Sequence, residues 1–413
     1  MTDVFVAGVG MTKFGRHSTL DYKALTRSAI TDALADACAN QKHIQWAAFA
    51  SCAIGMLHAQ HMIPGQVALR SMGFSGIPIF NVEGACASSS MAFHLAAQAI
   101  QSGSCDVALA VGTEKMNVED RERMFSVFDS AWDVTTKSEN QATFDKLGVS
   151  VPIPMGTQSD KPYSMFMDVY AAFCRQHMQE FGTTQRQIAE VAAKNHRHSV
   201  HNPLAQYREP LTVEAVLAAP PITYPLTLPM CAPISDGSAA AILCSKRGLK
   251  RLEIKRSRVV RLRGSVVRSG TTRSETEYRK HITAQAAAAA YEKTGIGPEE
   301  VNVAEVHDAT AMGEIIQVEN LQLVPYGEGG PAAERGELSL GGRLPVNTSG
   351  GLESKGHPIG ATGLGQIYEL VSQLRGECGD RQVGKPRVAI QENGGGVYGL
   401  EEAVAVINIF SST

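Results

Sequence analysis

The chain reads Asn81-Val82-Glu83-Gly84-Ala85-Cys86-Ala87-Ser88-Ser89-Ser90 at a predicted corner between a strand and a helix. A strand-like run precedes it at residues 76–80, and apolar residues follow at helical spacing over residues 87–101. Cys86 is therefore expected beside the first free N–H groups of a helix, which favour negative charge and should lower the pKa of its thiol. The simpler interpretation is a free cysteine buried as a small apolar side chain. The corner position and a partner histidine, described below, favour a nucleophile.

The composition excludes several classes of protein. A chain of 413 residues is long enough for two domains or one large α/β unit of two lobes. With 44% hydrophobic residues, 19% charged residues and a net charge of −3, it gives no reason to expect nucleic acid or a membrane as a partner. The sequence contains no evident secretory signal and no apolar run near the roughly 20 residues of a spanning helix. A cytoplasmic location is therefore expected.

The eight cysteines point to reduced thiols rather than to a metal site. They are scattered, with no Cys-x-x-Cys pair and no cysteine–histidine cluster at zinc spacing. We therefore predict no bound metal and no disulfide framework.

Strands and helices alternate, which predicts an α/β fold with a largely parallel layered sheet. The polar, methionine- and aromatic-rich residues 117–226 are predicted to form a long insertion across the mouth of this sheet, where it would shape a substrate site. Predicted strands lie at residues 4–8, 46–54, 105–111, 239–244, 258–267, 301–306, 387–391 and 403–409, and predicted helices at 22–39, 165–181, 184–196, 282–293, 312–323 and 363–375.

The two halves of the chain repeat the same order of features. In each half a glycine-containing motif opens a helix, a buried strand follows, and a small-residue turn closes it, at residues 84–111 and again at 356–396. We interpret this as an internal duplication with lobes at residues 1–250 and 251–413. A pseudo-twofold relation would bring both helix starts, and hence Cys86 and His357, to one seam.

His357 lies between a glycine and a proline in the loop 350–360. The glycines allow backbone and ligand to approach closely, and Pro358 suits the first turn of a helix. An imidazole at this position can accept the thiol proton of Cys86. A lone histidine is more often structural, but this setting favours catalysis.

Taken together, these motifs resemble the thiolase superfamily, and in particular its sterol-carrier-protein type. The resemblance covers essentially the whole chain. It rests on Gly84-Ala85-Cys86-Ala87-Ser88-Ser89, Glu114-Lys115-Met116, Pro233-Ile234-Ser235-Asp236-Gly237, Glu305-Val306-His307-Asp308, Asn347-Thr348-Ser349-Gly350-Gly351, Gly356-His357-Pro358-Ile359-Gly360-Ala361-Thr362-Gly363 and a predicted turn at Gly394-Gly395-Gly396.

The resemblance implies a duplicated α-β-α-β-α fold of five layers, a dimer, and coenzyme A (CoA) thioesters as substrates with no permanently bound cofactor. It further implies that Cys86 is acylated by a 3-oxoacyl-CoA, that His357 activates it, and that CoA accepts the acyl group. The N–H groups of Cys86 and Gly395 would bind one developing oxyanion, with Asn393 as a further candidate at that site, and each such donor stabilises the charge by roughly 3 kcal/mol. Proteins of this kind also work with a small zinc-ribbon/OB-fold partner.

The sequence departs from the family in its second acid/base. Where other thiolases have a cysteine before the last glycines, this chain has Asn393 preceded by Glu392, and its His307-Asp308-Ala309-Thr310 loop lacks the cysteine of the sterol-carrier type. His307 and His357 are the favoured carriers of the α-carbon proton, with Asp308, Glu392 and Tyr398 as alternatives. For Asp308 a supporting carboxylate or helix cap is the preferred interpretation, and Glu392 could be a solvated loop acid.

Three functions remain open from the sequence. The first is a thiolase-type acyltransferase for a branched or otherwise unusual acyl chain. The second is a retro-aldolase of the same fold acting on a CoA ester, and the third is a non-catalytic acyl-CoA-binding subunit of a hetero-complex. The basic clusters at residues 196–198 and 246–251 could contact CoA phosphates, although a solvated basic surface is the preferred interpretation.

Overall fold

A single nine-stranded sheet runs through the molecule in the computed structural model, which describes residues 2–255 and 258–413. Its strand order is β3-β2-β4-β7-β1-β8-β11-β10-β9. A short β5-β6 hairpin lies apart from it. The strands are β1 (Val4–Met11), β2 (Trp46–Ala50), β3 (Ile79–Val82), β4 (Val107–Glu114), β5 (Pro221–Thr223), β6 (Leu226–Thr227), β7 (Gly237–Cys244), β8 (Val260–Ser269), β9 (Val303–Glu305), β10 (Val388–Gly395) and β11 (Val404–Ser411).

The sheet is mixed, so the prediction of a largely parallel sheet was wrong. Strand β2 is parallel to β3 and β4, and β9 is parallel to β10, but the other neighbouring strands are antiparallel. The alternation of strands and helices reveals the parallel units. It does not reveal that β7 and β11 return beside β4 and β10 in the opposite direction.

The predicted duplication is confirmed by the order of strands. Counted outward from the central β1–β8 pair, one half runs β1, β7, β4, β2, β3 and the other runs β8, β11, β10, β9. These are the same sequence positions within each half. The place of β3 is taken in the second half by a single bridge between Ala304 and Val346.

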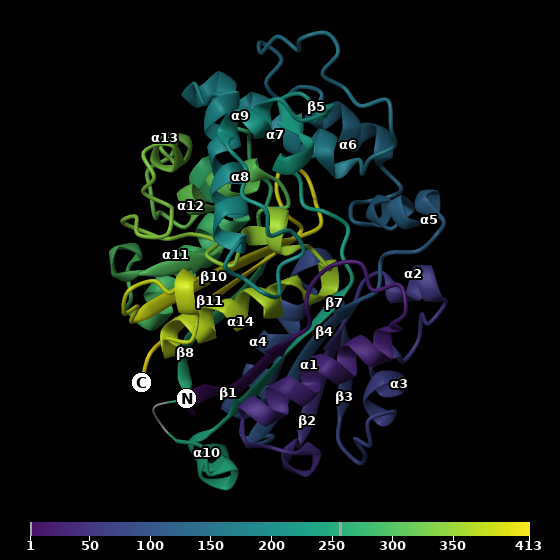
Figure 1. Ribbon diagram of the computed structural model, residues 1–413, viewed down its shortest axis with the longest axis vertical. Helices are drawn as coiled ribbons and strands as arrows, with labels where there is room; N and C mark the ends of the chain where they lie inside the picture. Colours follow the sequence, from purple (N-terminus) through teal and green to yellow (C-terminus); the bar gives the residue numbers. More distant parts are fainter. Residues whose placement is uncertain (1, 256–257) are drawn as a thin grey trace.

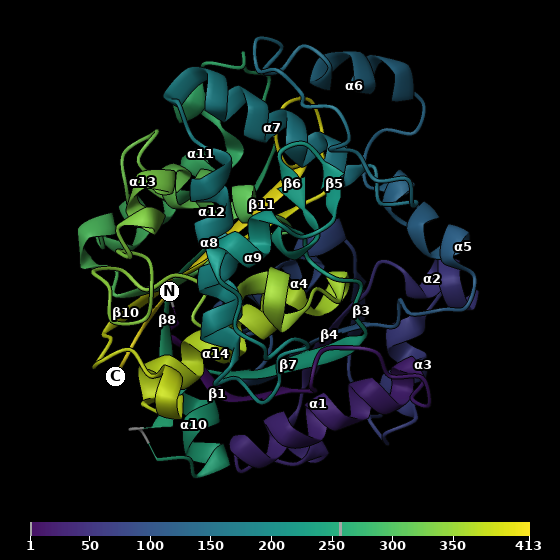
Figure 2. The ribbon, with the colours of Figure 1, turned by 45° about the horizontal axis from the view of Figure 1, so that its top comes forward.

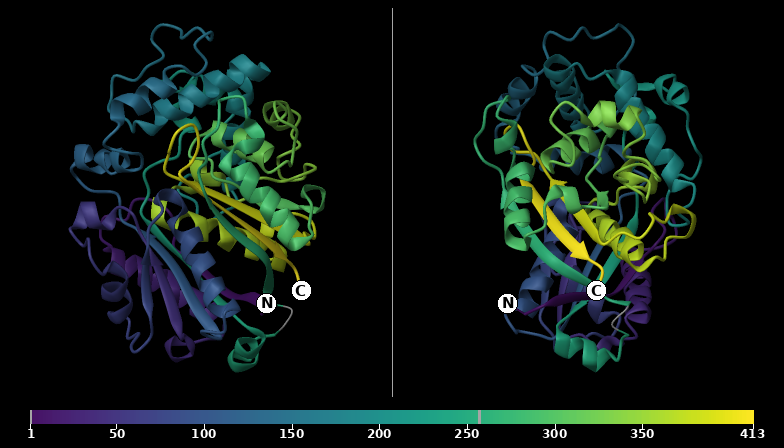
Figure 3. Two further views of the ribbon diagram at one scale, coloured as in Figure 1. Left: turned by 180° about the vertical axis from the view of Figure 1, so that it is seen from behind. Right: turned by 90° about the vertical axis from the view of Figure 1, so that its left-hand side faces the viewer.

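Helices cover the outer face of each half of the sheet, and further helices lie between the two halves. The five layers are therefore helices, one half of the sheet, helices, the other half of the sheet, and helices (Figure 1 and Figure 3). Helix α1 packs on β1 and β7 outside one half, and α11 packs on β8 and β11 outside the other. Between the halves, α4 and α14 pack on one another and form a continuous apolar core with the strands. The bounds are α1 (Tyr22–Asp36), α4 (Ser88–Gln101), α11 (Ile282–Thr294), α12 (Ala311–Asn320) and α14 (Thr362–Arg375).

The segment between β4 and β7 lies over one end of the sheet (Figure 1 and Figure 2). Its two predicted helices match α7 and α8, and Thr184 caps α8 with a reciprocal bond to Gln187. The segment carries α5 (Arg121–Ser126), α6 (Lys137–Phe144), α7 (Phe166–Phe181), α8 (Gln185–Ser199) and α9 (Val213–Leu217), and the remaining helices are α2 (Ile54–His58), α3 (Pro64–Arg70), α10 (Lys246–Leu252) and α13 (Gly329–Glu334).

Within the described residues, no helix combines the length and the apolar character that a membrane span requires.

Candidate active site

Cys86 lies on a tight turn between β3 and α4. The turn is a 3₁₀ helix (η2, Ala85–Ala87) that leads into α4, as the sequence predicted. Ala85 adopts a left-handed conformation with φ of 48°, which is unusual for a residue with a side chain and is often found at functional turns. Ser88 holds the turn, because its hydroxyl accepts from the Gly84 N–H (2.8 Å) and donates to the Ala85 carbonyl (2.6 Å). The Cys86 side chain is half-buried and lines a large cavity.

The end of β10 packs directly on the Cys86 turn. A Cβ at Gly395 would overlap the Gly84 carbonyl oxygen and lie 2.7 Å from the Ala87 nitrogen. The N–H groups of Cys86 and Gly396 favour the thiolate form of Cys86 and so act to lower its pKa. The assignment of the Gly395 N–H to the oxyanion site stays a prediction, and Gly395 lies directly against the Cys86 turn. The structure places Gly394 and Gly395 within β10, so the predicted glycine turn begins later.

Gly395→Ala tests this close packing. We expect the added methyl group to push β10 away from the Cys86 turn, lowering the free energy of unfolding by about 1–3 kcal/mol and slowing acylation of Cys86. Thermal unfolding and intact mass after incubation with a thioester measure the two effects. Gly384→Ala is the matched control, because a Cβ there meets nothing within 4 Å. Equal stability of the two variants would contradict the packing argument.

His357 follows a π-helical turn (η8, Gly351–Lys355) and enters the same cavity. Its N–H donates to the Ser235 hydroxyl at 2.9 Å, and its Nδ1 lies 2.7 Å from the Thr362 hydroxyl. Thr362 donates to the Pro358 carbonyl at 3.2 Å, so its oxygen accepts from His357 Nδ1–H. This assigns the tautomer and leaves His357 Nε2 free to accept a proton.

His307 completes a group of three with Cys86 and His357. One ligand atom from each residue lies within 4.8 Å of the others, and the two imidazole ring centres are 5.4 Å apart. Both ring nitrogens of His307 are buried without a hydrogen-bond partner. Such nitrogen and sulfur donors could also hold a Zn²⁺ ion. Unpaired buried nitrogens are costly, which suits a residue whose partner is a substrate atom.

The electrostatics differ from the sequence prediction. Burial raises the pKa of the Cys86 thiol to about 12, which outweighs the opposite effect of the Cys86 and Gly396 N–H groups. Burial also lowers the pKa of His307 to about 4 and that of His357 well below its usual value. The site therefore holds a neutral thiol beside two neutral imidazoles at pH 7. The expected lowering of the thiol pKa was wrong, because the helix N-terminus is weaker than desolvation here.

The pH dependence of Cys86 alkylation follows from this raised pKa. A thiol is unreactive and its thiolate reactive, so the rate of modification by iodoacetamide should rise about tenfold per unit between about pH 7 and about pH 10, with no plateau. Peptide mass spectrometry measures the rate at Cys86 separately from the other cysteines. A constant rate above about pH 6 would instead indicate a preformed thiolate–imidazolium pair.

Four other predicted site residues do not line the cavity. Asp308 accepts from the Leu352 N–H (2.8 Å) and from Asn195 (3.1 Å), so it supports the π-turn before His357. It does not cap α12, whose N-cap is Thr310. Glu392 is fully buried in β10 and accepts from the His307 N–H at 2.8 Å, so it is no solvated loop acid.

Asn393 and Tyr398 are also removed from the site. Asn393 accepts from Ser90 at 2.7 Å, between β10 and α4, so the prediction that it contributes to the oxyanion site was wrong. Successive side chains of a strand point to opposite faces, which explains why Glu392 faces His307 and Asn393 does not. Tyr398 is 66% exposed and does not line the cavity. Among the histidine, acid and tyrosine candidates, His307 and His357 are the ones that line the cavity with Cys86.

Two of the recognised motifs prove to be structural clamps. Lys115 Nζ lies 2.6 Å from Asp236 Oδ2, and Asp236 also accepts from the N–H groups of Met116 and Asn117, each at 2.7 Å. Glu114 accepts from the N–H groups of Cys52 (2.9 Å) and Gly360 (3.0 Å). These buried acids fix the segments that carry the Cys86 and His357 turns relative to one another.

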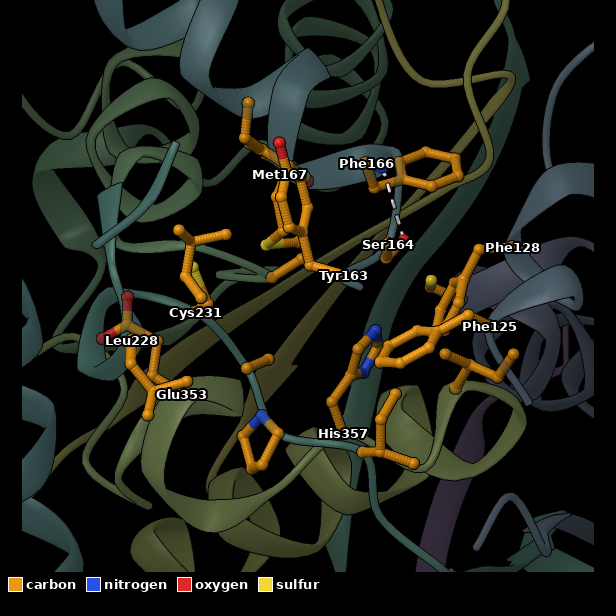
Figure 4. Close-up of a pocket in the computed structure, with 18 of the residues that line it drawn as sticks. Phe125, Phe128, Tyr163, Ser164, Phe166, Met167, Leu228, Cys231, Glu353 and His357 are labelled. Atoms are coloured by element: carbon orange, nitrogen blue, oxygen red, sulfur yellow. Dashed lines mark hydrogen bonds between the residues drawn. The ribbon is translucent and has the colours of Figure 1, made fainter. Parts of the chain in front are cut away.

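The cavity has a volume of about 1420 Å³ and extends away from Cys86 under the segment between β4 and β7. Figure 4 shows Leu228, Cys231 and Glu353 on one side and His357, Phe125 and Phe128 on the other. Most of its apolar and aromatic wall comes from residues that the sequence did not single out, because they lie far apart along the chain. These include Met124, Phe125, Phe128, Tyr163, Phe166, Met167, Tyr170, Phe173, Tyr207, Leu211, Ile222 and Leu228.

Of the two basic clusters suggested by the sequence, residues 196–198 contribute His196 to the cavity wall and residues 246–251 contribute nothing. Lys246, Arg247 and Arg251 lie on α10, where they pair with Asp3 and Asp106 at the opposite end of the molecule from the α7–α9 segment (Figure 1). The solvated-surface interpretation therefore fits α10 better. Basic side chains that do line the cavity are those of Lys13, Arg16, Arg121, Lys161 and Arg208.

Comparison with known proteins adds to this picture. Residues 4–217 match the family "Thiolase, N-terminal domain" and residues 264–408 match "Thiolase C-terminal domain-like". The chain is 36% identical to Sterol carrier protein 2 of Homo sapiens, over 98% of this chain and 71% of that protein. It is 34% identical to Benzoylsuccinyl-CoA thiolase subunit BbsB of Thauera aromatica (95% and 94%) and 34% identical to Acetyl-CoA acetyltransferase of Methanothermobacter thermautotrophicus (100% and 100%).

Solved structures share the same fold. The Ltp2-ChsH2(DUF35) aldolase matches with a TM-score of 0.77 at 22% identity, over 100% of this chain and 98% of that chain. Human mitochondrial 3-ketoacyl-CoA thiolase in complex with CoA matches with a TM-score of 0.68 at 17% identity, over 100% and 98%. Together with the family matches over both halves, this identifies the chain as a member of the thiolase family of acyltransferases.

Proposed function

We propose that the chain cleaves, or in the reverse direction forms, a 3-oxoacyl-CoA through an acyl intermediate on Cys86, with CoA as the acyl acceptor. The observation that carries the proposal is the grouping of Cys86, His307 and His357 donor atoms within 4.8 Å on the wall of one large cavity. A thiol beside a neutral imidazole is the arrangement required for nucleophilic acyl transfer.

The first step is the formation of the acyl enzyme. Cys86 sulfur bonds to the 3-oxo carbon while His357 Nε2 takes the thiol proton, so no free thiolate has to exist beforehand. We assign the N–H groups of Cys86 and Gly395 to the oxyanion that forms on the 3-oxo oxygen, since Gly395 packs against the turn that carries Cys86. The bond between carbons 2 and 3 then breaks, and its electron pair leaves as the enolate of the shorter CoA thioester.

The second half of the cycle needs a proton and an acceptor. We assign His307 to the thioester oxygen of the departing enolate, since its two ring nitrogens are unpartnered. The α-carbon takes up one proton, which the His357 imidazolium can supply. CoA then attacks the acyl–Cys86 thioester, its thiol proton returns through His357, and Cys86 leaves protonated.

The wall of the cavity supports a bulky apolar acyl group. Its aromatic and aliphatic side chains come mainly from the segment between β4 and β7, and a site of this size suits a branched or ring-containing chain better than an acetyl group alone. The basic residues Lys13, Arg16, Arg121, Lys161 and Arg208 provide charge for the CoA phosphates.

Intact mass spectrometry with candidate 3-oxoacyl-CoA esters tests the proposal. A mass increase equal to the acyl group, mapped to Cys86 and removed by free CoA, supports it. Release of an aldehyde or ketone without an adduct supports a retro-aldolase instead, and the solved Ltp2-ChsH2(DUF35) structure, which shares the fold, is named an aldolase. Binding without any turnover supports a non-catalytic subunit. Either of the last two results overturns the proposal.

We also propose a homodimer that joins the free edges of β3. This strand ends the sheet, so its outer edge has no strand partner among the residues that the structure describes, and Phe80 on it is 49% exposed. Phe80→Glu should convert the dimer to a monomer in light scattering. Val149→Glu, another exposed apolar position but in the α6–α7 loop, should leave the dimer intact. A monomeric wild-type protein would contradict this proposal.

A small zinc-ribbon/OB-fold partner is a further proposal for the segment between β4 and β7. Two comparisons support it: BbsB is named as a subunit, and the Ltp2 structure contains ChsH2(DUF35). We retain the division of the chain into lobes 1–250 and 251–413 as a proposal as well.

A further inference from the structure

Glu353 is a cavity residue that the proposed mechanism does not use. It lies on the π-turn η8, just before His357, with 1% of its surface exposed. Figure 4 shows it beside Leu228 and Cys231, on the side of the cavity away from Phe125 and Phe128. Its carboxyl group therefore lies on the wall across from His357, where a part of the substrate other than its reacting carbons can contact it.

The carboxyl group of Glu353 lacks adequate hydrogen-bond partners. Its Oε1 is buried without any partner, and its Oε2 has only Asn195 Nδ2 at 3.4 Å. The same Asn195 amide also donates to Asp308 (3.1 Å) and Glu314 (3.2 Å), which are closer. A buried polar atom left unpaired costs about 1–3 kcal/mol, so a partner from outside the chain is expected.

Burial and the neighbouring acids favour the protonated form of this carboxyl. Three acids, Asp308, Glu314 and Glu353, surround Asn195, and the lysine among them, Lys194, pairs with Glu314 at 2.9 Å. Burial, followed by the effects of Asp308 and Glu314, raises the pKa of Glu353 well above its usual value. A protonated carboxyl has an O–H to donate, and the neighbouring Leu228 side chain offers no acceptor.

We propose that Glu353 is a specificity residue that donates a hydrogen bond to a neutral oxygen on the acyl group of the substrate. The substrate class is then a 3-oxoacyl-CoA with a hydroxyl, carbonyl or ether oxygen beyond its 3-oxo group. A substrate that carries a carboxylate at this point is disfavoured. The positive charge of Lys194 is already paired with Glu314, and two further acids, Asp308 and Glu353, lie nearby. This inference rests on the proposed acyl transfer and adds the chemistry of the acyl chain.

The test compares 3-oxoacyl-CoA esters of one chain length that carry a hydroxyl at successive carbons or none. Wild-type enzyme should prefer one hydroxylated ester by about 10–100-fold in kcat/KM, the range expected when a buried donor gains or loses its acceptor. Glu353→Leu should lose this preference and cleave the plain ester within about threefold of wild type. Glu353→Gln keeps a donor of the same shape and should retain part of the preference.

Several outcomes overturn the inference separately from the proposed function. If wild-type enzyme cleaves the plain ester with the same kcat/KM as every hydroxylated ester, Glu353 does not recognise an oxygen on the acyl group. If Glu353→Leu retains the preference, another residue does, and a drop in Tm that Glu353→Gln shares would assign the carboxyl to folding alone. If no ester of either kind acylates Cys86, the proposed acyl transfer fails instead. The comparison of esters on wild-type protein needs no variant, so it stands even if Glu353→Leu does not fold.

Discussion

Cys86→Ala is expected to abolish cleavage of 3-oxoacyl-CoA, with a loss of at least about 10⁴-fold in kcat, as found when a nucleophile is removed from a site that acts as a unit. The reason is that no other thiol belongs to the group of donors within 4.8 Å, among the residues that the structure describes. Intact mass should show no acyl adduct on this variant. CoA binding, measured by calorimetry, should remain within about threefold of wild type, since the cavity is unchanged.

Cys38→Ser is the matched control for this experiment. Cys38 is exposed and does not line the cavity, so its replacement removes a reactive thiol without touching the site. The acyl adduct and the rate of cleavage should be those of wild type. Undiminished thiolysis in Cys86→Ala, or an adduct that disappears in Cys38→Ser, would refute the assignment of Cys86 as nucleophile.

The positions of Cys86 and His357 were predictable from the sequence because local signals determine them. Small residues open a helix after Cys86, and glycine and proline surround His357, so both histidine and cysteine fall at helix starts. The duplication then places the two starts at one seam. The structure confirms this arrangement, with their ligand atoms within 4.8 Å.

Properties that depend on several segments at once were not predictable. Whether the helix N-terminus or desolvation controls the pKa of Cys86 depends on what covers the thiol, and the cover comes from the segment between β4 and β7. Which backbone N–H groups act on the Cys86 thiol depends on how β10 packs against η2. No sequence pattern marked Glu353 as a site residue. Its lack of hydrogen-bond partners arises because Asn195, which is distant in sequence, also donates to two closer acids.

The side chains of β10 alternate between the two faces of the sheet, and this alternation separates Glu392 from Asn393. Glu392 and Asn393 are neighbours on one strand, so they must face opposite layers, and only one of them could reach the seam. The predicted strand ended at residue 391 and the predicted turn began at Gly394, so the rule did not reach these two residues. With the strand recognised, Asn393 would have been assigned to the packing of α4, as observed in its bond with Ser90.

His307→Ala is expected to separate the breaking of the carbon–carbon bond from acyl transfer. The orphaned ring nitrogens of His307 point to a role at the enolate oxygen, which develops charge only when that bond breaks or forms. Thiolysis, and exchange of the α-proton of acetyl-CoA with deuterium, should both fall by about 10²–10³-fold, the usual effect of losing one such donor. Exchange of labelled CoA with an acyl-CoA through Cys86 involves no enolate and should fall by less than about tenfold.

His357→Ala provides the contrast, because this residue takes the thiol proton in every reaction of Cys86. It should depress thiolysis, deuterium exchange and CoA exchange together, by about 10²–10⁴-fold each. The ratio of the two exchange rates therefore distinguishes a group that stabilises the enolate from one that activates sulfur. Equal losses in both exchanges for His307→Ala would mean that His307 helps to activate the Cys86 sulfur. Another residue would then have to stabilise the enolate oxygen. A loss confined to deuterium exchange and thiolysis would assign His307 to the enolate oxygen, as proposed.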